Sequence, residues 1–174
     1  MQNYIPPFEI TNIMLERVSS IMKKIGGLEN YKDLNKMPVL RRNNRIKSIH
    51  SSLAIEANSL SLSQVKDVID GKLVIGPEKE IQEVKNAYNA YLKIKEVNPY
   101  SIKDLKEIHG IMTYLTTEES GKFRSTGEGV FDENGNCIHI CPPANQVEEL
   151  MEQLFNWMKE KKNEIHPLIL SSVF

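Results

Sequence analysis

The residues best suited to chemistry are Ser52 and Glu56, in the run Ser52-Leu53-Ala54-Ile55-Glu56-Ala57-Asn58. Residues four positions apart are neighbours on a helix surface, so this hydroxyl and this carboxylate share one face. Such a carboxylate can hold an arginine through two parallel hydrogen bonds, in one fixed orientation. The spacing therefore places a hydroxyl and a carboxylate together near the end of a helix, although the same spacing occurs by chance in many helices.

Each of these groups also has an ordinary interpretation. For Glu56 taken alone, a solvated surface carboxylate is favoured, whereas for Ser52 a hydroxyl bonded back to its own helix and one that faces a nucleotide are equally compatible with the sequence. Three arginines precede the pair, either as a phosphate-binding patch or as a solvated basic face. The second interpretation is favoured, because the formal net charge of the whole chain is only −1. The three are Arg41, Arg42 and Arg45.

A metal site is the other chemistry that the sequence raises. Cys137 and Cys141 flank His139 in a segment typical of a strand. Four residues of extended chain span roughly 13 Å, whereas each thiolate on a zinc ion lies about 2.3 Å from the metal. We therefore predict two unpaired cysteines and no metal site.

Composition is that of an ordinary globular chain. The 174 residues are 40% hydrophobic and 26% charged, which suffices for one domain with a proper core. No apolar run approaches the length of a membrane span, and the first residues lack the basic and apolar regions of a secretory signal. We expect a cytoplasmic protein with no membrane or nucleic-acid partner.

The elements that must position Ser52 and Glu56 are predicted to be helical. Apolar spacing predicts a first helix over residues 10–25, which Gly26-Gly27 should end. The next helix starts near Pro38. Its apolar stripe should consist of Val39, Ile46, Ile49 and Leu53.

Capping signals predict the helices that follow. Ser61 and Gln64 form a capping box, and Gly71 suits the end of that short helix. Further helices should begin at Gly76-Pro77 and at Ser101. The inward residues of the last are expected to be Leu105, Ile108, Met112 and Leu115.

One β-hairpin interrupts the helices. Asn134-Gly135 favours a type I′ turn with positive φ at both residues. A two-residue turn there pairs Phe131 with Ile138 and Val130 with His139. A long helix carrying Trp157 follows, and a last one begins at His166-Pro167. The predicted fold is therefore all-α with one small β-hairpin.

Three ordered segments resemble a known family. Residues 41–62 resemble the inhibitory helix of Fic-domain proteins, whose signature is Ser/Thr-x-x-x-Glu-Gly/Asn; Ala57 departs from its usual glycine. Residues 83–88 are similar to the helix that follows. Gly121-Lys122-Phe123-Arg124-Ser125, the hairpin and Pro142-Pro143 resemble the Fic flap.

The resemblance implies an organisation. Residues 1–100 form an N-terminal helical region with an inhibitory helix at about 38–58. Residues 101–174 form the first part of a Fic core, with the flap at about 129–141. The loop His-x-Phe-x-Asp/Glu-Gly-Asn-Gly-Arg does not occur in the chain. We therefore assign no catalytic residue here and expect the gene to continue into that loop beyond residue 174.

The resemblance also implies an activity. Fic proteins typically transfer AMP from ATP, with Mg²⁺, to a hydroxyl of a target protein. Glu56, with Ser52 and Asn58, corresponds to the inhibitory site. The target would add as a strand to the flap; self-modification and a homo-oligomer are also compatible with the family. The flap residues are Val130, Phe131, Ile138 and His139.

Two alternatives belong to other classes. The chain could be a non-catalytic regulatory module that presents its inhibitory helix to a separate partner. The whole protein could instead remove AMP or transfer another phosphate-containing group, because one scaffold hosts several activities.

Overall fold

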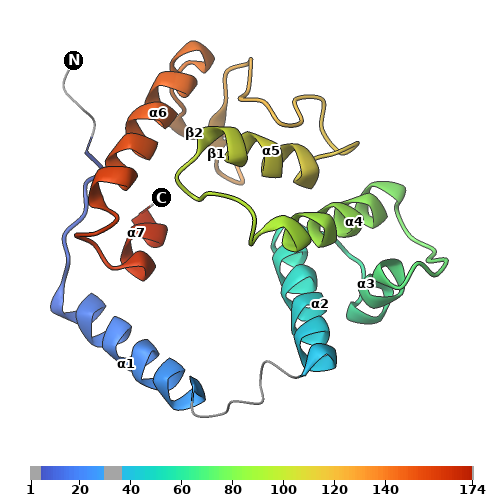
Figure 1. The fold of residues 1–174 in the computed structure, drawn as a ribbon. Helices are drawn as coiled ribbons and strands as arrows, with labels where there is room; N and C mark the ends of the chain where they lie inside the picture. Colours follow the sequence, from blue (N-terminus) through green and yellow to red (C-terminus); the bar gives the residue numbers. More distant parts are fainter. Residues whose placement is uncertain (1–4, 30–36, 174) are drawn as a thin grey trace. The chain divides into compact units, whose positions relative to one another are not determined.

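The structure is a computed structural model that describes residues 5–29 and 37–173. It confirms a helical chain with one antiparallel two-stranded sheet (Figure 1). In chain order the elements are α1 (Asn12–Glu29), α2 (Pro38–Ile55), α3 (Leu62–Ile69), α4 (Glu78–Lys93), α5 (Ile102–Met112), β1 (Gly129–Phe131), β2 (Cys137–Ile140), α6 (Ala144–Lys161) and α7 (Pro167–Val173).

The chain forms two compact units. One is Val39–Glu148, and the other combines Met1–Pro38 with Glu149–Phe174. The division that the sequence analysis placed at residue 100 separates the N-terminal helical region from the expected Fic core. These contact-based units do not test it, so it stays a prediction.

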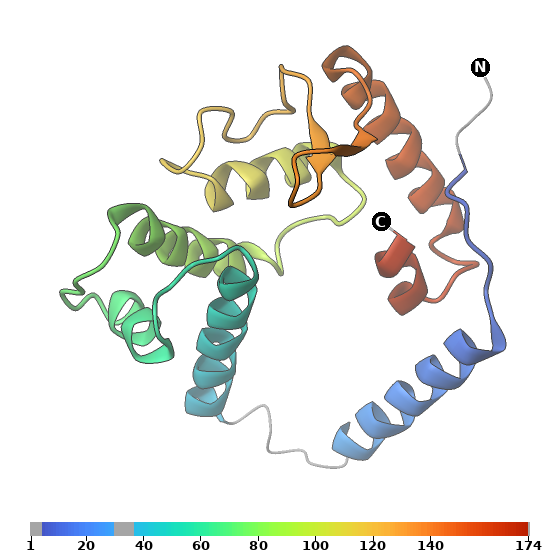
Figure 2. The ribbon, with the colours of Figure 1, turned by 180° about the vertical axis from the view of Figure 1, so that it is seen from behind.

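The core of the Val39–Glu148 unit lies where α2, α3 and α4 meet. Figures 1 and 2 show α3 and α4 packed next to α2. Apolar side chains of all three helices and of the α2–α3 connection are buried there: Ile46, Ile49, Leu53, Leu60, Val65, Val68, Val84 and Ala87. This cluster fixes the end of α2, which carries the candidate site.

Three apolar residues expected in the interior are exposed: Val39, Met112 and Leu115. Met112 is the last residue of α5 and is 37% exposed. Val39 is 71% exposed, because it lies in the first turn of α2, before the part of that helix that reaches the core. Leu115 is 73% exposed and follows α5 in a left-handed conformation, with φ of 59°. None of the residues of α5 itself is fully buried.

Local capping explains where α3 and α5 begin. The Ser61 hydroxyl accepts the Gln64 N–H at 3.3 Å, and the Gln64 side-chain oxygen accepts the Ser61 N–H at 2.9 Å. This reciprocal pair confirms the predicted capping box. The Ser101 hydroxyl caps α5 by accepting the Asp104 N–H at 3.2 Å.

The other unit contains α1, α7 and most of α6. Its buried residues include Trp157, whose ring meets Phe8 edge to face at 5.8 Å between centroids. Helix α1 does not end at Gly26-Gly27 but continues to Glu29. Neither glycine adopts the positive φ that ends a helix, so they only weaken it. Within the described residues, no helix combines the length and apolar character needed to cross a membrane.

Candidate regulatory site and docking hairpin

Ser52 and Glu56 lie on the exposed surface at the end of α2. Ser52 is in the last turn of the helix, and Glu56 immediately follows its final residue, Ile55. Both side chains are exposed, and neither forms a hydrogen bond or ion pair with another side chain among the described residues. The buried neighbours Ile49 and Leu53 hold this turn of the helix against the core.

The backbone after Glu56 closes α2 with a tight turn. The Asn58 N–H donates to the Leu53 carbonyl at 3.0 Å, and the Ala57 N–H donates to the Ala54 carbonyl at 3.2 Å. This is the Schellman pattern, which needs a left-handed residue after the helix. Ala57 takes that conformation with φ of 63°, although glycine is the residue that adopts it without steric cost.

Asn58 is buried and does not face solvent beside Glu56. It is only 8% exposed. Its amide nitrogen donates to a Glu83 carboxylate oxygen at 2.9 Å and to the Glu80 carbonyl at 3.1 Å. Its amide oxygen accepts the Leu60 N–H at 3.2 Å. Asn58 thus attaches the turn to the start of α4.

The electrostatic position of Glu56 is unfavourable within this chain. A helix C-terminus carries partial negative charge, so a carboxylate there is typically destabilising by about 0.3–1 kcal/mol. Arg42, near the opposite end of α2, pairs with Asp70 at the end of α3. A carboxylate on a fixed backbone, at the end of a helix that repels it, is well placed to bind a cation supplied from elsewhere.

The hairpin pairs as predicted at one position and differs at the next. Val130 lies opposite His139, as expected, but Phe131 lies opposite Cys137 rather than Ile138. Ile138 is therefore an extra residue, and β2 contains a β-bulge there. Bulges break the alternation of side chains and bend the strand.

The turn also differs from the type I′ prediction. Gly135 has φ of 82°, but Asn134 does not have positive φ. The Gly135 N–H donates to the Asp132 carbonyl at 3.0 Å, and the Asp132 N–H donates to the Asn136 carbonyl at 3.0 Å. The loop therefore has three residues, with a turn followed by a left-handed glycine.

Asp132 explains this longer loop. Its carboxylate accepts the Asn134 N–H at 2.9 Å and the Asn136 N–H at 2.8 Å. The Asn136 side-chain amide also donates to it, and these hydrogen bonds lower the pKa of the Asp132 carboxyl below its ordinary value. The carboxylate thus organises the loop around itself.

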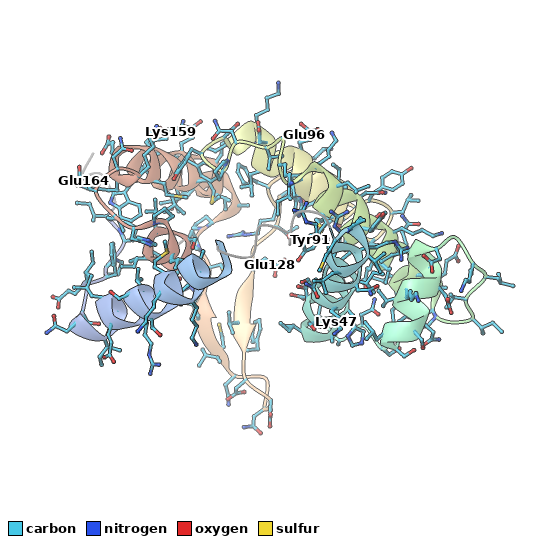
Figure 3. All side chains as sticks on the ribbon, turned by 60° about the horizontal axis from the view of Figure 1, so that its bottom comes forward. Lys47, Tyr91, Glu96, Glu128, Lys159 and Glu164 are labelled. Atoms are coloured by element: carbon cyan, nitrogen blue, oxygen red, sulfur yellow. The ribbon has the colours of Figure 1, made fainter. Side chains whose placement is uncertain are left out.

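The strands expose apolar side chains. Val130, Phe131 and Ile138 are all exposed, as is His139, and Ile140 is 80% exposed. Figure 3 shows the two strands running outward from Glu128 at the base of the hairpin. The sheet has two strands, so each strand has an outer edge without a partner strand in the described structure.

Arg124 connects the two ends of the hairpin. Its guanidinium donates to the Thr126 carbonyl at 2.6 Å, before β1, and to the Pro142 carbonyl, after β2. Beside it, the Glu119 carboxylate accepts the N–H and the hydroxyl of Ser125. These bonds lower the pKa of the Glu119 carboxyl.

The segment before Arg124 packs closely on α5. Gly121 has φ of 72°, and a side chain at Gly110 would meet the Gly121 Cα at 3.4 Å. The Lys106 ammonium lies 4.3 Å from the centre of the Phe123 ring and 2.8 Å from a Glu148 carboxylate oxygen at the start of α6. The hairpin base is therefore fixed, although its strands are exposed.

Cys137, the exposed first residue of β2, and Cys141, which directly follows that strand, are both unpaired. Among the described residues there is no cluster of three histidine, cysteine or acidic side chains that could hold a metal ion. No cofactor ligand is assigned to this part of the chain.

Sequence reasoning placed Glu83 and Arg124 in segments that resemble the family but gave neither a role, and it did not find Glu80. Two acidic residues three positions apart at the start of α4 share a helix face, and this was the available signal for Glu80 and Glu83. For Arg124 no local signal exists, because its second partner, Pro142, is 18 residues away.

Comparison with known proteins identifies the class. No family model matches the chain. A protein adenylyltransferase Fic from Nematostella vectensis is 29% identical over 130 residues, covering 69% of this chain and 29% of that protein. Its counterpart from Culex quinquefasciatus is 26% identical over 133 residues, covering 71% and 25%.

A solved structure agrees. The crystal structure of a Fic family protein from Desulfovibrio desulfuricans G20 is 39% identical, with a TM-score of 0.89. The match covers 98% of this chain and 51% of that one. The chain belongs to the Fic family. It spans about half the length of the solved relative and less than a third of the curated ones.

Proposed function

We propose that the whole protein is a protein adenylyltransferase, which transfers AMP from ATP to a hydroxyl of a target protein, and that Glu56 restrains it. The observation that carries the proposal is the exposed Glu56 carboxylate, which follows a firmly hydrogen-bonded helix end and has no partner among the described residues. It occurs in a chain whose relatives are named adenylyltransferases. Residues 1–174 would supply the restraint and the target-docking surface.

The restraint follows from charge pairing. In the family, the last arginine of the catalytic loop holds the γ-phosphate of ATP. A glutamate that forms a two-fold hydrogen-bonded pair with this arginine withdraws it from the phosphate. ATP then binds without its α-phosphate aligned for attack, and alignment supplies much of the rate in such chemistry. Ser52, one turn earlier, would face the same nucleotide.

ATP and Mg²⁺ are part of this proposal, although their ligands are expected outside these residues. Mg²⁺ would neutralise charge that develops on the phosphates. The described chain contributes only the carboxylate that competes for the arginine. The proposed setting is the cytoplasm.

The hairpin is the proposed target-docking surface. An extended segment can add to an exposed sheet edge through main-chain hydrogen bonds, which fix register with little demand on side chains. Within the described structure each strand has an edge without a partner strand, and the strands expose apolar side chains. Register would place the target hydroxyl opposite the reacting phosphate.

The test compares labelling by wild-type protein and Glu56 variants, using the full-length protein and radioactive ATP. Glu56→Gly and Glu56→Gln should each raise labelling of target and of the protein itself by at least about tenfold. A hydrogen bond between charged groups contributes about 1.5–3 kcal/mol, and about 1.36 kcal/mol is a factor of ten in rate.

The matched control is Glu152→Gln, which removes an exposed, unpaired carboxylate of α6 and should leave labelling unchanged. Equal labelling by wild type and both Glu56 variants, with folding matched by circular dichroism, would make Glu56 an ordinary surface carboxylate. Release of AMP from a labelled target, faster than its labelling, would identify the reverse activity instead.

A further inference from the structure

The chain reversal after α2, residues 57–59, is hydrogen-bonded to α4 through side chains as well as closed by its own backbone bonds. Among the described residues, Asn58 and Asn86 are the buried polar side chains. All the hydrogen bonds of the Asn58 side chain are made within the protein. Its amide nitrogen donates to the Glu83 carboxylate and the Glu80 carbonyl, and its amide oxygen accepts the Leu60 N–H. A buried amide with these partners has no free donor for a nucleotide.

Glu80 reinforces the same attachment. One of its carboxylate oxygens accepts the Ser59 N–H at 2.7 Å and the Ser59 hydroxyl at 2.8 Å. Glu80 lies in the first turn of α4, where a negative charge is favoured by the helix dipole. Asn58 and Ser59, which follow each other in the chain reversal after α2, are thus both hydrogen-bonded to the first two turns of α4.

Helix α4 is a firm support for these bonds. Its residues Val84, Ala87 and Ala90 are buried in the core. On the same helix, Asn86 donates to the carbonyls of Met112 at 3.2 Å and Tyr114 at 2.7 Å, at the end of α5. The turn after α2 is therefore anchored to an element that cannot shift independently.

We propose that Asn58 is the positioning residue of the restraint, acting through Glu83 and Glu80 rather than by touching nucleotide. This inference rests on the proposed function of Glu56. By fixing the backbone two residues after Glu56, the Asn58 amide keeps the carboxylate at one place. Loss of the amide frees the turn, so the carboxylate spends less time where it can hold the arginine.

The experiment is a double-mutant cycle in the full-length protein. Asn58→Ala should raise labelling from radioactive ATP by about tenfold. A change of this size is typical of two residues whose effects are coupled through one hydrogen-bond network. In the Glu56→Gly background the same substitution should have no further effect, because its route of action is already removed. A residue with only a structural role would lower labelling in both backgrounds.

Glu83 provides a second pair of variants. Glu83→Leu removes the acceptor at similar volume and should raise labelling like Asn58→Ala. Glu83→Gln keeps an oxygen that can accept from the Asn58 amide, and should stay near the wild type. This pair replaces Asn58→Ala if that variant fails to fold.

The outcomes separate the two claims. If Glu56→Gly raises labelling but Asn58→Ala and Glu83→Leu do not, the positioning role is wrong and the restraint stands. If Asn58→Ala raises labelling equally in both backgrounds, Asn58 acts independently of Glu56, which also overturns the inference. If Glu56→Gly has no effect, the proposed restraint fails, and the positioning role fails with it.

Discussion

The turn after α2 and the hairpin are held in opposite ways. The turn is anchored by buried Asn58 and by two carboxylates of α4, so its backbone has one position. The hairpin is fixed at its base by Arg124, whereas its strand side chains are mostly exposed. The contrast fits the proposed roles: a restraint needs a single geometry, and a docking strand needs a free edge on a fixed base.

The largest expected effect comes from loosening the hairpin base. Arg124→Ala removes both guanidinium bonds to Thr126 and Pro142. We expect target labelling by the full-length protein to fall by about tenfold or more, since hydrogen bonds from a charged donor contribute about 1.5–3 kcal/mol. ATP affinity, measured by calorimetry, should stay unchanged.

The control for Arg124→Ala is Arg17→Ala, which removes an exposed arginine of α1. A parallel fall in ATP affinity for Arg124→Ala alone would show that the base positions the nucleotide site as well, and would weaken the contrast.

A smaller effect is expected at the edge of β2. The Cys141 N–H donates to the Glu128 carbonyl, towards β1, so alternation directs the Ile140 N–H outward. Ile140→Pro should remove this donor and lower target labelling by about fivefold. That factor corresponds to the loss of one ordinary hydrogen bond, which contributes about 1 kcal/mol. Ile140→Val keeps the donor and should label like the wild type. Equal labelling by the two variants would exclude strand addition at Ile140.

A substitution should also stabilise the turn after α2, the region that is contrasted with the hairpin. Ala57→Gly removes the steric cost of a left-handed residue, about 1–2 kcal/mol. We expect the Asn58 amide, which donates to Leu53, to exchange with deuterium at least about fivefold more slowly, if opening of the turn controls exchange. The exchange of a distant amide, such as that of Trp157, serves as the control. Faster exchange at Asn58 would mean that the alanine conformation is not strained.

The smallest effect concerns acid and the hairpin loop. The pKa of Asp132 is lowered because Asn136 and the loop N–H groups bind its ionised form. A carboxyl whose pKa is lower in the folded state contributes stability above its unfolded pKa and loses it as pH falls through the folded value. The loop should therefore be unchanged between about pH 5 and 8 and loosen in stronger acid.

The measurement is an NMR titration of the Asn134 and Asn136 amide shifts. Asp132→Asn should abolish the acid transition at these amides. A transition at the pH of an ordinary, unshifted aspartate would contradict the bonds that Asp132 accepts.

Local sequence signals predicted the helix starts well, and tertiary contacts account for what they missed. The capping box of Ser61 and Gln64 spans four residues, so its chemistry is complete within the segment. Asn58 is different, because its partners lie 22 and 25 residues away. The family resemblance implied an inhibitory role for it beside Glu56, whereas in the structure its buried amide donates to α4.

The hairpin shows the same limit at shorter range. Asn134-Gly135 correctly located the turn, and the Val130–His139 pair follows from it. The loop type was wrong because the pattern takes no account of the Asp132 carboxylate, which captures the N–H groups of Asn134 and Asn136. The longer loop in turn displaces Ile138 into a bulge.

That bulge has a consequence for behaviour at high concentration. A flat, apolar strand edge invites identical chains to stack on one another, which leads to fibres or precipitates. Here β2 is only four residues long, bent at Ile138, and followed directly by Cys141 and two prolines. Such an edge is too short and too twisted to propagate a repeating array. The same irregularity that changes the register thus leaves room for one guest segment while discouraging a growing stack of copies.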